Sequence, residues 1–222
     1  MKAQPVLFLL KLSIYVILAV SDVNRALLLN AIQHIVHLYL ILKTGFAQME
    51  KDERLKKPRI IGVMGGSVAD EADAERAYRL GQLIAENGWV LLNGGRRAGI
   101  MDASARGAAE AGGITIGILP DDRDHPGVSE HIQIPIFTGM GNARNVINVL
   151  TSHVIVACPG GAGTLSEIAL ALKVNKPVIL LQSAEQNRQN LEVIGQFTKT
   201  STIFEAESPE SVIEIIHRLW AR

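Results

Sequence analysis

The sequence has one cysteine, no excess of charge of either sign and no clean apolar run long enough to span a bilayer. Cys158 has no partner for an internal disulfide or a zinc site, which fits a reducing compartment. Lysine plus arginine and aspartate plus glutamate both total 22. Because no strong positive field would gather a polyanion, we expect a protein that does not bind nucleic acid. The single cysteine predicts a cytoplasmic location.

The N-terminal part of the chain differs in character from the rest. Nearly continuous apolar runs occupy Pro5–Val20 and Ala26–Leu42, whereas Met49–Arg59 is dense in charge. Both runs are shorter than the roughly 18–20 residues that a membrane span needs, and Lys11 interrupts the first. We therefore predict an apolar extension and charged linker over residues 1–58.

Three interpretations of this extension stay open. Polar residues recur at helical spacing in the second run and would suit a membrane-surface or partner helix: Asn30, Gln33, His34 and His37. Met1 and Lys2 before an apolar stretch resemble a secretory signal. The third interpretation, which we favour, is an upstream extension that the native protein lacks, with Met49 as its start. Membrane contact is expected only through residues 1–48, and no metal site is expected there, because no nearby carboxylate or cysteine completes one.

From Arg59 onward, apolar and β-branched runs alternate with segments of helix length. The runs are Ile60–Met64, Trp89–Leu92, Ile114–Leu119, Ile132–Phe137, Val154–Ala157 and Val178–Leu181. A weaker strand near Ser201–Phe204 precedes a predicted helix that Ser208 caps and Pro209 opens. This alternation predicts a Rossmann-like, doubly wound α/β domain over residues 59–222, with a mostly parallel sheet of about six or seven strands and helices on both faces.

Glycine-rich turns follow three of the predicted strands, where ligands of parallel sheets bind. They are Gly65-Gly66-Ser67, Gly94-Gly95-Arg96-Arg97 and Gly160-Gly161-Ala162-Gly163-Thr164. Glycine lets backbone N–H groups approach a phosphate, and the helix after the third turn adds free N–H groups and a positive dipole end. Such glycines also make tight turns, but three turns and two arginines favour an anion site. Neither G-x-G-x-x-G nor G-x-x-x-x-G-K-[ST] is present, which disfavours an NAD enzyme and a P-loop ATPase.

The third turn carries a family signature. Pro159–Glu167 matches P-G-G-x-G-T-x-x-E at every specified position and resembles the Lonely Guy (LOG) family, often labelled lysine decarboxylase. Active members of that family are cytokinin-activating phosphoribohydrolases, and they pair the motif glutamate with an arginine fifteen residues before the motif proline. The resemblance spans Ile60–Leu181 and implies Arg144 and Glu167 as catalytic residues.

Two positions depart from the pattern of those enzymes. Asn145 stands where they carry a lysine, and Ser166 where they commonly carry an acid. With these departures the chain resembles the branch that includes the algal molybdenum cofactor carrier protein, which binds a phosphorylated pterin without obvious turnover.

Two functions therefore stay open. The first is a nucleotide-binding protein that takes a nucleoside 5′-monophosphate or similar phosphorylated ligand and hydrolyses its N-glycosidic bond. In it Glu167 would stabilise positive charge on the sugar and orient water, while Arg144 holds the substrate. The second is a non-catalytic carrier of the molybdenum cofactor or a ligand sensor. Neither needs a cofactor beyond the bound AMP-like nucleotide or molybdenum cofactor itself.

The partners expected from the sequence follow from the same resemblance. It implies a homodimer or higher homo-oligomer, with sites near the subunit interface. A pyridoxal phosphate decarboxylase is disfavoured, because Lys173 and Lys176 lie at the far end of their predicted helix. The acidic loop from Asp121 to Gly127 is typical of a solvated turn, so no metal is expected there either.

Overall fold

The computed structural model describes residues 58–181 and 202–221, together with Gln33, Val36 and Ile194. The chain divides into two units, Met1–Lys57 and Pro58–Arg222, and the description below concerns the second. The membrane, signal and metal interpretations of residues 1–48, and the choice of Met49 as start, rest on residues outside the described ones and stay predictions. No helix among the described residues is long and apolar enough to cross a membrane.

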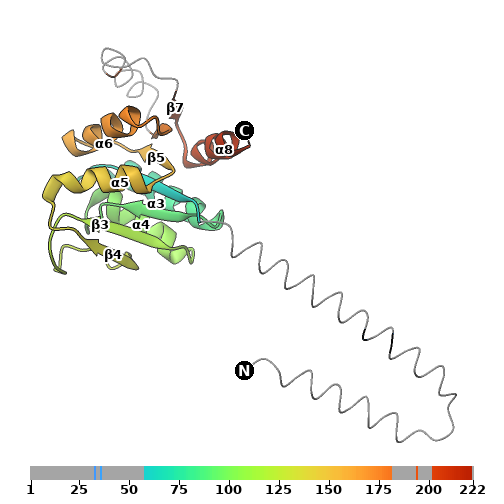
Figure 1. Cartoon of the computed structure of the whole chain (residues 1–222), viewed down its shortest axis with the longest axis horizontal. Helices are drawn as coiled ribbons and strands as arrows, with labels where there is room; N and C mark the ends of the chain where they lie inside the picture. The colour runs from blue at the N-terminus through green and yellow to red at the C-terminus, as the bar shows by residue number, and fades with distance from the viewer. Residues whose placement is uncertain (1–32, 34–35, 37–57, 182–193, 195–201, 222) are drawn as a thin grey trace, which may run out of the picture. The chain divides into compact units, whose positions relative to one another are not determined.

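The second unit is built on one sheet of seven strands in the order β4-β3-β2-β1-β5-β6-β7 (Figure 1). Every neighbouring pair is parallel, which confirms the predicted parallel sheet. The strands are β1 (Ile60–Met64), β2 (Val90–Asn93), β3 (Thr115–Leu119), β4 (Ile134–Phe137), β5 (Val154–Ala157), β6 (Val178–Leu181) and β7 (Ile203–Ala206). Three of them, β1, β5 and β6, begin and end where the apolar runs predict.

Helices cover both faces of this sheet. They are α3 (Glu71–Glu86), α4 (Gly99–Glu110), α5 (Asn145–Thr151), α6 (Ala162–Lys173) and α8 (Pro209–Trp220), and a 3₁₀ turn, η1 (Gly141–Arg144), precedes α5. Ile61 and Val63 of β1 pack in one core with α3, α4 and α8. Met64 packs in a second core with α5 and α6. Because side chains alternate along a strand, β1 contributes to both cores, and the predicted doubly wound fold is confirmed.

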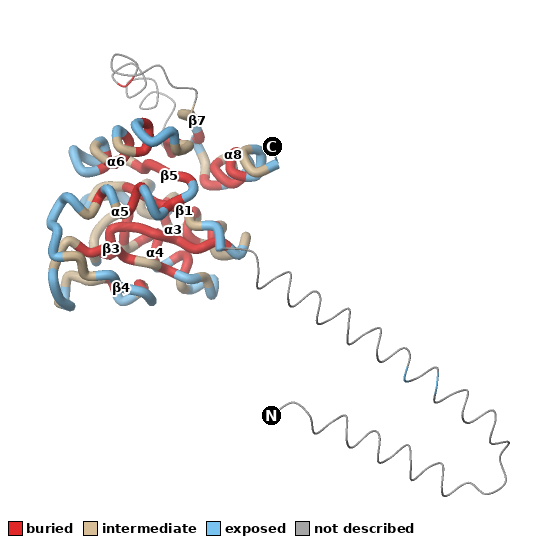
Figure 2. The backbone as a smooth tube through the Cα atoms, in the orientation of Figure 1, coloured by how far each residue is buried: buried red, intermediate tan, exposed pale blue. Residues whose placement is uncertain are grey.

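Burial along the sheet falls from the centre to one edge. All residues of β2, β5 and β6 are buried, whereas β4 is largely exposed (Figure 2). A parallel sheet covered on both faces needs apolar runs without polar alternation, and β5 and β6 have them. These two apolar runs therefore lie where both faces of the sheet are covered.

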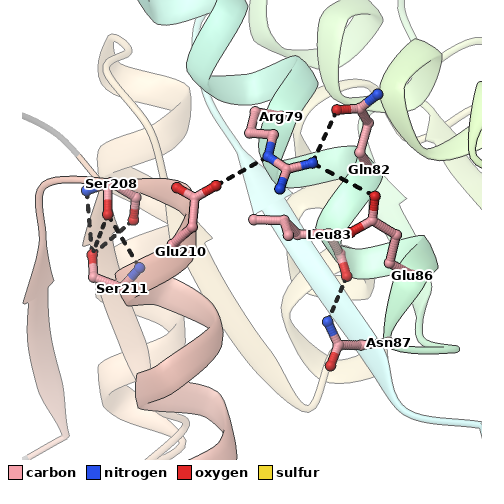
Figure 3. Close-up of polar contacts among 8 residues, drawn as sticks. All are labelled: Arg79, Gln82, Leu83, Glu86, Asn87, Ser208, Glu210 and Ser211. Carbon is pink, nitrogen blue, oxygen red and sulfur yellow. Dashed lines mark hydrogen bonds and ion pairs between the residues drawn. The ribbon is translucent and has the colours of Figure 1, made fainter.

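The C-terminal helix α8 begins as the sequence predicts. Ser208 caps it, its side chain accepts from the Ser211 N–H, and Pro209 occupies the first helical position. The Arg79 side chain on α3 reaches Glu210 on α8 at 3.0 Å (Figure 3). An exposed ion pair contributes at most about 1 kcal/mol, so the buried side chains of α8, such as Val212 and Ile216, hold the helix in place.

The order of the strands fixes where a ligand would bind. From β1 the chain winds outward through β2, β3 and β4, and from β5 it winds the other way through β6 and β7. The connections after β1 and β5 therefore leave in opposite directions. In such sheets a crevice opens between the two diverging connections, at the carboxyl ends of the strands.

Glycines bring the helices α3 and α4 unusually close together. A Cβ atom at Gly81 would lie 2.1 Å from the Ser104 carbonyl oxygen, and one at Gly107 would lie 2.0 Å from the Tyr78 carbonyl oxygen. Neither backbone can yield without moving a helix. These two glycines therefore set the separation of the helix pair that covers β1 and β2.

We predict that Gly107→Ala destabilises the fold by about 1–3 kcal/mol, because the added methyl group overpacks the interface between α3 and α4. Gly163→Ala is the matched control, since a Cβ there meets nothing within 4 Å and alanine favours a helix. Urea unfolding of both variants checks this. Equal stability of the two variants would contradict the close packing described here.

Candidate functional site

The turns after β1 and β5 lie side by side, as expected from the strand order. The Gly66 N–H donates to the Pro159 carbonyl at 3.0 Å. A Cβ atom at Gly160 would lie 2.9 Å from the Gly66 nitrogen, so a side chain at Gly160 would separate the two turns. The first and third glycine-rich turns are thus in direct contact.

The turn after β2 joins them through the start of α4. The Gly66 carbonyl accepts from the Ile100 N–H at 3.0 Å. Gly99 has a φ of 48°, a left-handed conformation that favours glycine, and its Cβ would lie 2.4 Å from the Gly66 oxygen. All three turns therefore meet at one edge of the sheet.

A cavity of about 250 Å³ opens where the turns meet. Most of the sequence-predicted site residues line it: Gly65, Gly66, Ser67, Gly94, Arg144, Gly161, Gly163, Thr164 and Glu167. Four residues that the sequence did not predict also line the cavity: Val63, Met64, Met101 and Asn142. The first three are apolar and carried no signal beyond that of core residues, whereas Asn142 precedes Arg144 by two positions in a polar turn.

The remaining predicted residues lie around the cavity without lining it: Gly95, Arg96, Arg97, Gly160 and Ala162. Arg96 pairs with Asp121 at 3.3 Å, and Arg97 pairs with Glu130 at 3.0 Å. Gly160 supports the lining indirectly, because a Cβ there would lie 2.2 Å from Thr164 Oγ1. The two arginines are thus engaged by acidic residues of the segment between β3 and β4.

Asp121 is the centre of that neighbouring cluster. His125 Nε2 lies 2.9 Å from its carboxylate, and this hydrogen bond, with the charge of Arg96, lowers the pKa of Asp121. Among the described residues, no group of three histidine, cysteine or acidic side chains is placed to hold a metal ion. The cluster is a network of surface charges beside the cavity.

The N-terminus of α6 forms one wall of the cavity. The helix begins at Ala162 with Gly161 as its N-cap, and the Leu165 N–H bonds to the Gly161 carbonyl at 3.1 Å. The N–H groups of the residues between them have no partner within the helix. A Cβ at Gly161 or Gly163 would meet nothing within 4 Å. Free N–H groups, a positive dipole end and open space together suit a phosphate.

Arg144 also lines this cavity. Its guanidinium lies against Gly94, where a Cβ would be only 2.6 Å from Nη1. Nη1 is buried and has no partner among the described residues. Burial lowers the pKa of Arg144, and the charge of Glu167 opposes that effect. Because arginine stays charged in proteins, a buried unpaired donor of this kind costs several kcal/mol unless an anion meets it.

Glu167 lies on the first turns of α6 and is buried, with 6% of its surface exposed. The Asn148 side-chain amide donates to its Oε1 at 2.6 Å. Burial raises the pKa of Glu167, while the Asn148 hydrogen bond and the Arg144 charge act in the opposite direction. The cavity thus holds a carboxyl group and a guanidinium that interact with each other.

A neutral pair links α5 and α6 beside these charges. The Asn145 amide donates to Ser166 Oγ at 2.8 Å, and Ser166 Oγ donates to the Gly163 carbonyl at 2.7 Å. These are the two positions that depart from the phosphoribohydrolase pattern. Cys158 takes no part, because burial raises the pKa of its thiol to about 12 and so keeps it unreactive.

Comparison with known proteins agrees with this geometry. A family model described as the SLOG cluster4 family matches residues 58–213. The molybdenum cofactor binding protein of Rippkaea orientalis is 49% identical, with a TM-score of 0.67 over 73% of this chain and 98% of that one. The molybdenum cofactor carrier protein of Chlamydomonas reinhardtii is 40% identical, with a TM-score of 0.66 over 75% of this chain and all of that one.

A more distant relative is a phosphoribohydrolase. The cytokinin riboside 5′-monophosphate phosphoribohydrolase of Rhodococcoides fascians is 27% identical over 151 residues, which are 62% of this chain and 74% of that one. The match of the family model to most of the chain and the likeness to both groups confirm the resemblance seen in the sequence. The chain belongs to the SLOG cluster4 family of the LOG superfamily, in the branch that resembles the molybdenum cofactor carrier proteins.

Proposed function

We propose that this protein binds a phosphorylated small molecule in the cavity between β1 and β5 and holds it without consuming it, with the molybdenum cofactor as cargo. The observation that carries the proposal is the buried, unpartnered Nη1 of Arg144, which belongs to the same cavity as the N-terminus of α6. Both features favour an oxyanion. The two similar structures are proteins that bind or carry the molybdenum cofactor.

The phosphate of the cargo would bind the N–H groups at the start of α6, helped by the hydroxyl of Thr164. Arg144 would donate from Nη1 to a phosphate oxygen or to a neighbouring oxygen of the ligand. Gly66 and Gly94 keep side chains out of this space. The cavity, at about 250 Å³, is slightly below the roughly 300–1,000 Å³ of pockets that enclose a whole drug-sized ligand, so the rest of the cargo would extend out of it.

One feature of the cavity favours holding over hydrolysis. The Asn145 and Ser166 pair is neutral, so the acid that the hydrolases commonly carry at the position of Ser166 is missing. Its absence weakens the electrostatic stabilisation that a cationic sugar intermediate would need.

We predict that protein isolated from cells that make the molybdenum cofactor carries molybdenum and a phosphorylated pterin, and that Arg144→Ala loses most of both. Loss of one charge-assisted hydrogen bond corresponds to about 10- to 100-fold weaker binding. Elemental analysis and mass spectrometry of the released pterin measure the cargo. Arg106→Ala is the control, because Arg106 is exposed on α4 and lies over the Tyr78 ring. Equal cargo in the Arg144→Ala variant would contradict the proposal.

The second candidate function is a nucleoside 5′-monophosphate phosphoribohydrolase, and the interaction of Arg144 with Glu167 in one cavity favours it. Water would add to C1′ of the ribose 5-phosphate, and the base would leave with a proton. The Glu167 carboxylate would stabilise the positive charge that develops on the sugar. Arg144 would bind the substrate oxygens, and the start of α6 would bind the 5′-phosphate.

On this candidate function, base release from AMP should fall with decreasing pH. The active form is the carboxylate, and burial raises the pKa of Glu167. Activity is therefore full above this raised pKa and is lost as the pH falls through it, at a higher pH than for an ordinary glutamate of pKa about 4.3. Chromatographic assay of released adenine between about pH 4 and pH 8 checks this. Absence of release by wild-type protein that binds AMP would eliminate the candidate function.

We further propose that the protein forms a homodimer through α5 and the start of α6. Val146 and Leu150 lie one turn apart on α5 and are 41% and 58% exposed, and Leu165 on α6 is 51% exposed. Val146 and Leu165 each adjoin the hydrogen-bonded Asn145 and Ser166 pair. Apolar side chains grouped in this way beside the cavity suit a second copy of the chain.

We predict that Leu150→Glu shifts the wild-type dimer to monomer, because two carboxylates would then face each other across the two-fold interface. Ile134→Glu is the control, since Ile134 is similarly exposed, at 45%, but lies on the edge strand β4. Light scattering coupled to size exclusion measures the mass. Monomeric wild-type protein at micromolar concentration would overturn this part of the proposal.

A further inference from the structure

Asn148 is a buried polar residue that the sequence did not single out. It lies on α5, has no exposed surface, and neighbours the buried Val149. Its amide nitrogen donates to Glu167 Oε1 at 2.6 Å and lies 3.7 Å from the sulfur of Met64. Its own carbonyl oxygen, Oδ1, is buried without a partner among the described residues. Asn148 does not itself line the cavity.

An apolar residue would be the expected occupant of this position. Burying a side-chain amide with one group unsatisfied costs about 1–3 kcal/mol, and α5 could pack on β1 and α6 without it. The Asn145 and Ser166 pair already links α5 to α6. The helices thus have a second link, and the Asn148 hydrogen bond additionally fixes one oxygen of the Glu167 carboxyl group.

We propose that Asn148 is a positioning residue that holds Oε1 of Glu167, so that Oε2 is presented to the ligand beside Arg144. The inference rests on the proposed function in one respect, namely that Glu167 meets the bound ligand. The structure gives Oε2 no hydrogen-bond partner among the described residues, and Glu167 lines the cavity. Asn148 thus holds Oε1 of Glu167, and Oε2 can accept a hydrogen bond from the ligand.

An asparagine can hold this carboxyl group in either of its protonation states. The carboxylate accepts from the Asn148 amide nitrogen, and a protonated carboxyl group would donate to Oδ1 once the amide had rotated. Oδ1 is free for that role. The charged group that faces Glu167 is Arg144. The charges of Arg96 and Asp121 act on the pKa of Arg144 in turn, in opposite directions. No charge other than that of Arg144 competes with Asn148 for the carboxyl group in the described part of the cavity.

The test compares AMP and inorganic phosphate as probes of the full chain, with affinities measured by calorimetry from about pH 5 to pH 8. Phosphate reports on the start of α6 and Arg144, whereas AMP also reports on Glu167. The variants are Asn148→Asp, Asn148→Leu and Glu167→Gln, and Val149→Ala is the control that disturbs α5 without removing the hydrogen bond. Circular dichroism establishes that each variant is folded.

We expect Asn148→Leu to bind AMP about tenfold more weakly at every pH, the loss of one hydrogen bond to a charged group. Asn148→Asp should bind AMP like wild type near pH 5, where two adjacent carboxyl groups share a proton, and lose affinity toward pH 8 as both ionise and repel. Glu167→Gln should weaken AMP binding. Phosphate affinity should stay within twofold of wild type in all variants, and Val149→Ala should bind both probes normally.

Several results would overturn the inference. One is an Asn148→Asp variant whose AMP affinity equals that of wild type at every pH. Another is a Glu167→Gln variant whose AMP affinity is unchanged. Equal loss of phosphate and AMP in the Asn148 variants would assign Asn148 a purely structural role instead. Wild-type protein that binds neither probe and is isolated without molybdenum and pterin would overturn the proposed function and this inference with it. The results above, obtained with wild-type protein that binds AMP, overturn this inference alone. If Asn148→Leu does not fold, the isosteric Asn148→Asp variant still decides the question.

Discussion

Nη1 of Arg144 lies buried beside the backbone of Gly94 and has no partner among the described residues. Desolvating a permanent positive charge is costly, so the surrounding structure must hold the side chain in place. Gly94 has no side chain that would displace it, and the carboxyl group of Glu167 offsets part of the charge. The start of α6 faces the same cavity with free N–H groups. An anion satisfies both the Arg144 Nη1 donor and these N–H groups.

The sheet makes this arrangement by its topology. Arg144 comes from the turn before α5 and Glu167 from α6, on either side of β5, while Gly66 follows β1. Only the adjacency of β1 and β5, with their connections diverging, brings these segments to one point. The close packing of α3 on α4 through glycine holds the turn after β2 in the same place, through the hydrogen bond from Ile100 to Gly66. The cavity between β1 and β5 is thus a consequence of the order in which the strands pair.

The sequence predicted the elements well and the long-range side-chain pairs poorly. Apolar runs located the strands because strands buried on both faces tolerate no polar alternation, and glycines marked the turns because backbone must approach closely there. Arg96 could not be placed from the sequence, since its partner, Asp121, is 25 residues away. Asn148 carried no signal, because its role depends on a contact with Glu167 across two helices. Such pairs follow from packing, which local pattern does not encode.

A crystal structure of the protein with bound AMP would show directly whether the cavity between β1 and β5 is the anion site. We expect the phosphate to lie within hydrogen-bonding distance of the N–H groups at the start of α6, Arg144 Nη1 to donate to the ligand, and Glu167 Oε2 to face it. A nucleotide bound at Arg96 and Arg97, with the cavity between β1 and β5 empty, would show that the anion site lies elsewhere.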